Sequence, residues 1–166
     1  MKASVLHKFC TPPVFEEVDD PVCGPNSVVI ELKACGVCRS DHHAWSGNDS
    51  DVKLPHIMGH ELAGIIVETG SNIKKFFIGD PVTVPFILGC GLCSDCQTGN
   101  STICDRQETI GFTIRGGFAQ FVEICFADFN LVRLPSSLGF ETAAAMGCRV
   151  TTAYRALTDR ASFCLL

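Results

Sequence analysis

The sequence predicts a mainly β fold with added helices (α+β), in which the strands form a partly open barrel or sandwich. Three observations support this class. Short alternating or β-branched segments recur through most of the chain, and turn residues separate them. Helical patterns appear only toward the C-terminal end. The length of 166 residues suits one domain with a hydrophobic core and is marginal for two.

Five segments carry the strand signals. Residues 28–33 read Val-Val-Ile-Glu-Leu-Lys and alternate well enough for a half-buried strand. Residues 62–69 form an apolar, β-branched run that stops at Gly70. The remaining predicted strands are residues 80–84, 118–124 and 130–134.

Two helices are predicted late in the chain. Ser136, Ser137 and Glu141 favour a helix start, and an alanine-rich run continues it to Met146. Residues 151–159 predict a second helix with its apolar side chains near one face.

Charge and composition exclude several classes of function. The net charge is -5 and the basic residues are scattered, so neither nucleic acid nor an anionic membrane is an expected partner. No apolar run approaches the ~18 residues that a spanning helix requires, and the N-terminus lacks a secretory signal pattern. We therefore expect a cytoplasmic protein. Its 11 cysteines are odd in number, and in a reducing compartment clustered cysteines indicate metal binding rather than disulfides.

The strongest local signal is CGLCSDCQTGNSTIC, a cysteine-rich lobe at about residues 89–105. Two-residue gaps let thiolates from one tight turn face a shared ion, and a fourth cysteine from the following loop completes a tetrahedron. Such a set leaves no open coordination position, so the predicted role is structural zinc. The four predicted ligands are Cys90, Cys93, Cys96 and Cys104.

Two alternatives exist for this lobe. Bacterial ferredoxins also use two-residue gaps, but their fourth cysteine follows after three residues and precedes proline. Here the last gap is seven residues and Asp105 follows Cys104, which disfavours an iron–sulfur cluster. Unrelated core thiols are also disfavoured, because a polar loop offers little core in which to bury four cysteines.

A second set of metal-type ligands is scattered over CGVCRSDHHAW and GHELAG. These stretches offer Cys38 and His60, with Asp41 and Glu61 as acidic partners. Catalytic zinc keeps three protein ligands and one open position. Cys38, His60 and one further thiolate would satisfy that requirement. Taken singly, a cysteine or histidine is more often a core thiol or a surface imidazole.

At this point the sequence resembles a known family. GVCRSDHH, GHELAGIIVETGSNIKKFFIGDPV, the cysteine lobe, GGFAQFVEI and AAAMGCRVTTAYRAL are similar, in order, to motifs of the medium-chain, zinc-dependent alcohol dehydrogenases. The resemblance is to their N-terminal catalytic domain, which has the GroES-like fold. It covers residues 1–160 and implies a GroES-like, partly open β-barrel with a zinc lobe.

The resemblance implies a role for each matching residue. Cys38, His60 and Cys148 match the three catalytic zinc ligands, and Asp41 matches the acid that orients the zinc-bound histidine. Glu61 matches an acid that lies near the metal.

Three more residues match the proton relay and the cofactor contacts. Ser40 matches the hydroxyl that hydrogen-bonds the alcohol, and His43 matches the histidine that passes the proton to solvent and lies by the cofactor. Arg39 matches a basic contact to the cofactor pyrophosphate. The resemblance also implies two zinc ions per chain, NAD or NADP, a small alcohol or aldehyde substrate, and homo-oligomers.

The C-terminal end departs from the family pattern. The family places a nucleotide-binding (Rossmann) domain beyond Arg160, whereas residues 161–166 read as an aberrant tail and no Gly-x-Gly-x-x-Gly turn is present in the chain. We therefore expect a chain truncated before that domain, and inactive alone because the cofactor domain is missing. The alternative function is a non-catalytic zinc-binding module or a partner-binding fragment.

Overall fold

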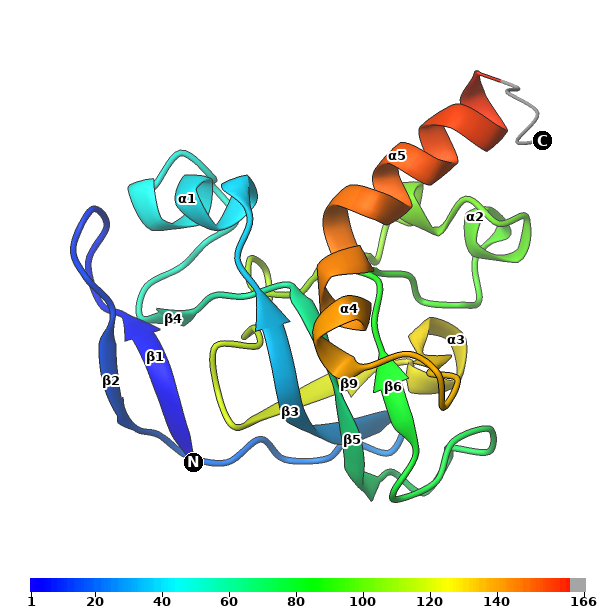
Figure 1. Cartoon of the computed structure of the whole chain (residues 1–166), viewed down its shortest axis with the longest axis horizontal. Coiled ribbons are helices and arrows are strands. Elements are labelled where there is room, and N and C mark those ends of the chain that lie inside the picture. Colours follow the sequence, from blue (N-terminus) through cyan, green and yellow to red (C-terminus); the bar gives the residue numbers. More distant parts are fainter. Residues whose placement is uncertain (162–166) are drawn as a thin grey trace.

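The computed structural model of the chain describes residues 1–161. At its centre lies an antiparallel sheet of five strands in the order β10-β6-β5-β3-β9 (Figure 1). The long strands β3 (Ser27–Gly36) and β5 (Glu61–Thr69) occupy the middle of this sheet. The flanking strands are β9 (Phe121–Cys125), β6 (Pro81–Thr83) and β10 (Val132–Arg133).

Two smaller sheets extend this centre. Strand β1 (Lys2–Leu6) pairs with β2 (Val14–Glu17) on one side and with β4 (His56–Ile57) on the other. Strand β7 (Ile87–Leu88) pairs with β8 (Glu108–Thr109), and the cysteine-rich lobe lies between them in sequence.

Four short helical segments lie on the connections between strands. They are α1 (Arg39–Ser46), α2 (Ser94–Gln97), the 3₁₀ turn η1 (Ser101–Ile103) and α3 (Ala127–Asn130).

A continuous helical run ends the described part of the chain. It comprises α4 (Phe140–Ala145), the π-helical turn η2 (Met146–Val150), α5 (Thr151–Arg155) and a second π-helical turn, η3 (Ala156–Arg160). Figure 1 shows α4 against the central sheet and α5 projecting away from it on the side of the lobe. No helix in the part described is long and apolar enough to cross a membrane.

The main core lies on the face formed by β3, β5 and β9. Ile30, Leu62, Ile66 and Ile124 are buried there with 0% exposure. The two long strands approach closely at Gly64, where an added Cβ would lie 2.2 Å from the carbonyl oxygen of Glu31. The pairing register of β3 and β5 shifts at this level, between Leu32 and Ala34.

The predicted fold class is confirmed, and no nucleotide-binding Rossmann unit is present in residues 1–161. The strands predicted at 28–33, 62–69, 80–84 and 118–124 are found, the last as β9. The two late helices are found as one continuous run, which begins at Phe140 with Gly139 as its cap and not at Ser136 or Ser137. The strand predicted at 130–134 shortens to β10, because residues 127–130 form α3. The helix α1 was not predicted. Its N-terminal cap is Cys38, which is not one of the serine, threonine, aspartate or asparagine residues that usually mark a helix start.

Candidate metal centres

Cys38 begins α1 as its N-terminal cap. Its Sγ accepts the backbone N–H of Ser40 at 3.3 Å, while Asp41 Oδ2 accepts the backbone N–H of Cys38 at 2.8 Å. This reciprocal capping box satisfies two backbone donors at the helix start and fixes the position of the thiol. The helix N-terminus also carries partial positive charge, which favours a thiolate there.

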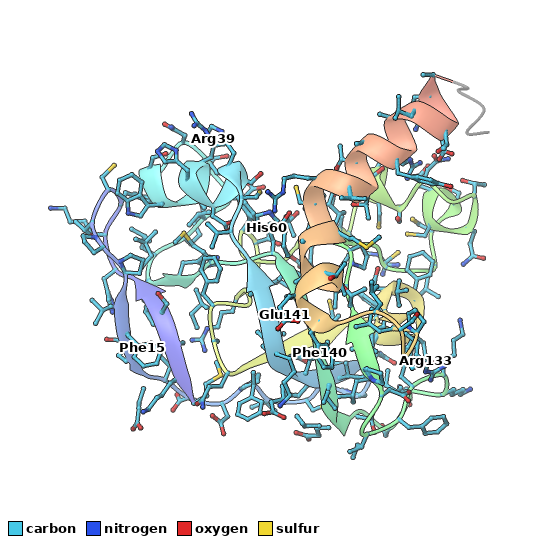
Figure 2. The ribbon with its side chains drawn as sticks, in the orientation of Figure 1. Phe15, Arg39, His60, Arg133, Phe140 and Glu141 are labelled. Atoms are coloured by element: carbon cyan, nitrogen blue, oxygen red, sulfur yellow. The ribbon has the colours of Figure 1, made fainter. Side chains whose placement is uncertain are left out.

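His60 immediately precedes β5 and is 0% exposed. Its Nε2 lies 3.1 Å from Cys38 Sγ, and its Nδ1 lies 3.2 Å from Asp41 Oδ1. Because the Asp41 carboxylate accepts the Nδ1–H, the ring is oriented with its Nε2 atom facing the cysteine sulfur. The Asp41 carboxylate therefore hydrogen-bonds both the ring of His60 and the backbone N–H of Cys38. In Figure 2, His60 lies between α1 and the helical run that starts at α4.

Cys148 reaches the same place from the π-helical turn η2, over eighty residues further along the chain. One ligand atom each of Cys38, His60, Glu61 and Cys148 lies within 4.8 Å of the others. π-Helical turns inside α-helices often occur at functional sites, since the extra residue changes the direction of a side chain.

The surroundings of Cys38, His60 and Cys148 shift the pKa of each group. Burial acts to raise the pKa of the Cys38 thiol, but hydrogen bonds from Ser40 and His60 outweigh it and hold that pKa below its usual value. Burial acts to lower the pKa of His60, but the hydrogen bond and charge of Asp41 outweigh it and raise that pKa. For Cys148, burial and then the charge of Cys38 raise the pKa to about 11.

The donor set fits a zinc ion. Two sulfurs and one imidazole nitrogen make a three-ligand set of the kind that leaves a fourth position open. In a tetrahedral site the sulfur and nitrogen ligands stand about 3.6 Å apart. Cys38 Sγ and His60 Nε2 lie 3.1 Å apart, so the two atoms need to move apart only slightly to bind the ion.

A cavity of about 290 Å³ adjoins this set. Ser40 and His43 line it together with Phe86 and Phe112. The two phenylalanine rings also pack against the His60 ring, with centroid distances of 5.9 and 5.4 Å. The ligands themselves are not among its lining residues, but Ser40 contacts Cys38 and both phenylalanines contact His60, so the cavity lies beside the metal-type ligands. Arg39 lies at the start of α1 with its side chain exposed (Figure 2).

The four lobe cysteines also converge, with one sulfur from each within 4.8 Å of the others. Cys93 begins α2, and its Sγ accepts the Cys96 backbone N–H at 3.5 Å. The sulfurs of Cys90 and Cys96 stand 4.0 Å apart, far beyond the ~2.05 Å of a disulfide and close to the ~3.8 Å between ligands of tetrahedral zinc. The lobe thus fits a closed four-sulfur metal site.

The sulfurs of the lobe differ in their surroundings. Backbone N–H groups of Leu92 and Cys93 lower the pKa of Cys90 to about 6, and burial raises the pKa of Cys96 to about 12. The lobe is anchored to the domain by Asn130, whose side chain bonds both the N–H and the carbonyl of Gly89, at 3.0 and 2.9 Å.

Several residues at these sites carried no sequence signal. Arg149 donates two hydrogen bonds to the Glu61 carboxylate, and Arg106 donates one to Cys90 Sγ. Phe86 and Phe112 form the apolar part of the cavity wall, which also contains Asn48, Asp49 and Asp51. Only the position of Arg149, next to Cys148, hinted at a role, since Arg106 and the two phenylalanines lie outside any quoted ligand pattern.

The family model of the alcohol dehydrogenase GroES-like domain matches residues 24–136 of this chain. An alcohol dehydrogenase of Geobacillus stearothermophilus is 39% identical over 159 residues, covering 95% of this chain and 47% of that protein. An NAD-dependent alcohol dehydrogenase of Sulfolobus acidocaldarius is 34% identical over 163 residues, with 95% and 47% covered. The chain spans about half the length of the curated relatives it matches.

Solved structures agree with this assignment. The cobalt and zinc bound thermostable alcohol dehydrogenase of Pyrobaculum aerophilum aligns with a TM-score of 0.85 and 31% identity, over 98% of this chain and 49% of that one. The alcohol dehydrogenase of Aeropyrum pernix aligns with a TM-score of 0.85 and 31% identity, over 98% and 48%. With residues 24–136, more than half its length, matched by that family model, the chain belongs to the alcohol dehydrogenase GroES-like domain family.

Proposed function

We propose that the chain is the zinc-binding catalytic domain of an oxidoreductase that converts a small alcohol into an aldehyde or ketone and passes the hydride to NAD or NADP. The observation that carries this proposal is the convergence of Cys38, His60 and Cys148, with Asp41 orienting the histidine. Four-cysteine lobes occur in many structural zinc proteins, whereas a three-ligand set beside a cavity is the arrangement that zinc enzymes use.

The three ligands would hold one zinc ion and leave a coordination position facing the substrate. Zinc bound there supplies Lewis-acid chemistry, lowering the pKa of an alcohol hydroxyl and polarising a carbonyl. The four cysteines of the lobe would hold a second, structural zinc, for a total of two per chain.

The residues of the cavity would handle the proton. Ser40 Oγ would accept a hydrogen bond from the alcohol hydroxyl and release its own proton as it takes up that of the alcohol. His43, which lines the same cavity and is exposed at its rim, would pass the released proton to solvent. Phe86 and Phe112 give the cavity an apolar wall that favours the carbon skeleton of the alcohol and limits water beside His60. Glu61 lies within reach of the ligands but is held by Arg149.

The nicotinamide cofactor would meet the chain on the side of α1, where Arg39 offers an exposed cation for the pyrophosphate. The relatives are about twice as long, and hydride transfer requires a bound cofactor. We therefore propose that the 166-residue chain binds zinc but gives no turnover when assayed alone with NAD or NADP.

Metal analysis of the purified chain tests the proposal. We expect two zinc ions per chain in the wild type and one in Cys148→Ser, because that change removes a ligand from one set only. Cobalt in the Cys38–His60–Cys148 site should change its visible spectrum when a short alcohol is added, and this response should vanish in Cys148→Ser. Iron with a visible charge-transfer band would instead favour the cluster interpretation of the lobe and overturn the two-zinc assignment.

A second candidate is a non-catalytic zinc module that binds a partner protein. The exposed apolar side chains of α5 and η3, Tyr154 at 60% and Leu157 at 45%, favour it. The alcohol response of the cobalt-substituted site discriminates the two, because a module without a substrate site has no reason to give one.

A further inference from the structure

The cysteine lobe carries a concentration of negative charge. Four thiolates around one Zn²⁺ leave two net negative charges, and Asp95, Asp105 and Glu108 lie in the same stretch of sequence. Within residues 89–108 the only lysine or arginine is Arg106. A buried or half-buried anion of this kind needs donors at its sulfurs to remain stable.

Arg106 supplies such a donor. It follows the fourth cysteine by two residues, and the turn there, closed by Gln107 N–H to Cys104 O at 3.0 Å, returns the chain toward the first cysteine. Its Nη2 donates to Cys90 Sγ at 3.3 Å. The same sulfur accepts the Leu92 backbone N–H at 3.4 Å, so Arg106 adds a charged donor to a sulfur that already has backbone donors.

A second arginine contacts the lobe in a different way. Arg155, on α5, donates to the carbonyl of Gly99 at 3.3 Å and to Asn100 Oδ1 at 3.1 Å. Among the hydrogen bonds of the described residues, those of Arg155 reach lobe oxygens and none of its sulfurs. Arg106 thus contacts a metal-ligand atom of the lobe, whereas Arg155 contacts only other atoms of the lobe.

We propose that Arg106 is a positioning residue for the lobe metal, which retains the ion by donating a charge-assisted hydrogen bond to the Cys90 sulfur. This rests on the proposed structural zinc. The bond withdraws electron density from the sulfur and balances its charge, so the Cys90 thiolate is a poorer target for protons and competing metals. Arginine suits this position because its charge is permanent and its N–H groups are fixed in direction, whereas lysine offers a mobile point charge.

Cadmium-113 NMR of the metal-loaded chain tests the proposal. A four-sulfur site and a site of two sulfurs and one nitrogen give separate resonances, so the lobe is observed alone. Loss of the four-sulfur signal to excess EDTA is measured for the wild type, Arg106→Gln, Arg106→Lys and the control Arg155→Gln. We expect loss about tenfold faster in Arg106→Gln, about threefold faster in Arg106→Lys, and within about twofold of wild type in Arg155→Gln.

The chemical shift supplies a second readout, which a merely structural role would not move. It should change in Arg106→Gln, because the Cys90 sulfur loses its donor, and stay unchanged in Arg155→Gln. Equal release rates and shifts in Arg106→Gln and wild type would overturn the proposal. So would an Arg155→Gln effect as large as that of Arg106→Gln, since docking of the lobe would then explain both. A wild-type chain without any four-sulfur resonance would instead overturn the structural zinc of the proposed function.

Discussion

The Glu61 carboxylate is clamped by the Arg149 guanidinium, with Nη2 to Oε2 at 2.9 Å and Nε to Oε1 at 3.2 Å. Glu61 adjoins His60 and Arg149 adjoins Cys148, so this pair connects two segments that each carry a metal-type ligand. The backbone N–H of Cys148 also approaches Glu61 Oε1, at 3.4 Å. The carboxylate is 0% exposed, whereas 60% of the Arg149 side chain is exposed.

Arg149→Gln should destabilise the chain more than Glu61→Gln does. The first change leaves a buried carboxylate with only the Cys148 N–H, while the second leaves an exposed guanidinium that water can solvate. We expect the thermal midpoint of metal-free Arg149→Gln to fall by about 5 °C, and that of Glu61→Gln by less than half as much. Circular dichroism melts measure both.

The double variant supplies the control for this pair. Arg149→Gln destabilises the chain because it leaves the charged Glu61 carboxylate buried without its partner. Adding Glu61→Gln removes that charge and should restore part of the lost thermal midpoint. If the two losses simply add, Glu61 is stabilised by groups other than Arg149, and the clamp does not connect the two segments energetically.

Asp41→Asn should weaken the Cys38–His60–Cys148 metal site selectively. An asparagine amide that donates toward His60 Nδ1 moves the ring proton to Nε2, the atom that faces Cys38 Sγ. We expect metal affinity at this site to fall about 10- to 100-fold, with the lobe site unchanged. Competitive chelator titration should therefore show one weakened and one intact site. Equal weakening of both sites would indicate a general loss of folding instead.

Gly64→Ala should be among the most damaging single-methyl changes in the sheet. The new Cβ would stand 2.2 Å from the Glu31 carbonyl oxygen, and backbone on a paired strand has no room to move. We expect a loss of about 3 kcal/mol in the free energy of unfolding, measured by urea denaturation. Gly139→Ala is the matched control. Its Cβ meets nothing closer than 3.6 Å, so the cost should not exceed the ~1 kcal/mol of a poorer helix cap.

The metal ligands of the lobe could be predicted from the sequence because they lie close together along the chain. Three cysteines at two-residue gaps are forced near one another by a single turn, and the fourth follows in the same loop. Cys148 could not be found in this way. Its sulfur joins Cys38 and His60 only through the packing of α4 and η2 against the central sheet, so it was identified by resemblance alone.

The contacts that tune the two sites escaped prediction for a related reason. In the sequence, Arg106 and Arg149 cannot be distinguished from ordinary surface cations. Their roles depend on the position of each guanidinium group in the folded structure. The helix α1 was missed because its cap is a cysteine, a residue with little capping preference, and because its mixed polar residues give no apolar stripe.

His56 provides a pH dependence that is independent of both metal sites. It is 6% exposed, and its Nε2 has no hydrogen-bond partner within the described residues. Burial lowers its pKa below the usual 6.5, the charge of Arg115 acts in the same direction, and the backbone of Gly111 acts against them. The folded chain therefore binds a proton at His56 less readily than the unfolded chain does.

Acid should therefore destabilise the folded chain through His56. Stability from neutral His56 is fully present above the unfolded pKa of 6.5 and is lost as the pH falls below it toward the folded pKa. Urea midpoints at about pH 7.5 and pH 5.5 should thus differ more in the wild type than in His56→Phe, which cannot titrate. His42→Phe, at an exposed position, should keep the wild-type difference. If His56→Phe retains the full wild-type difference, the acid sensitivity arises elsewhere, and the buried imidazole is not a source of it.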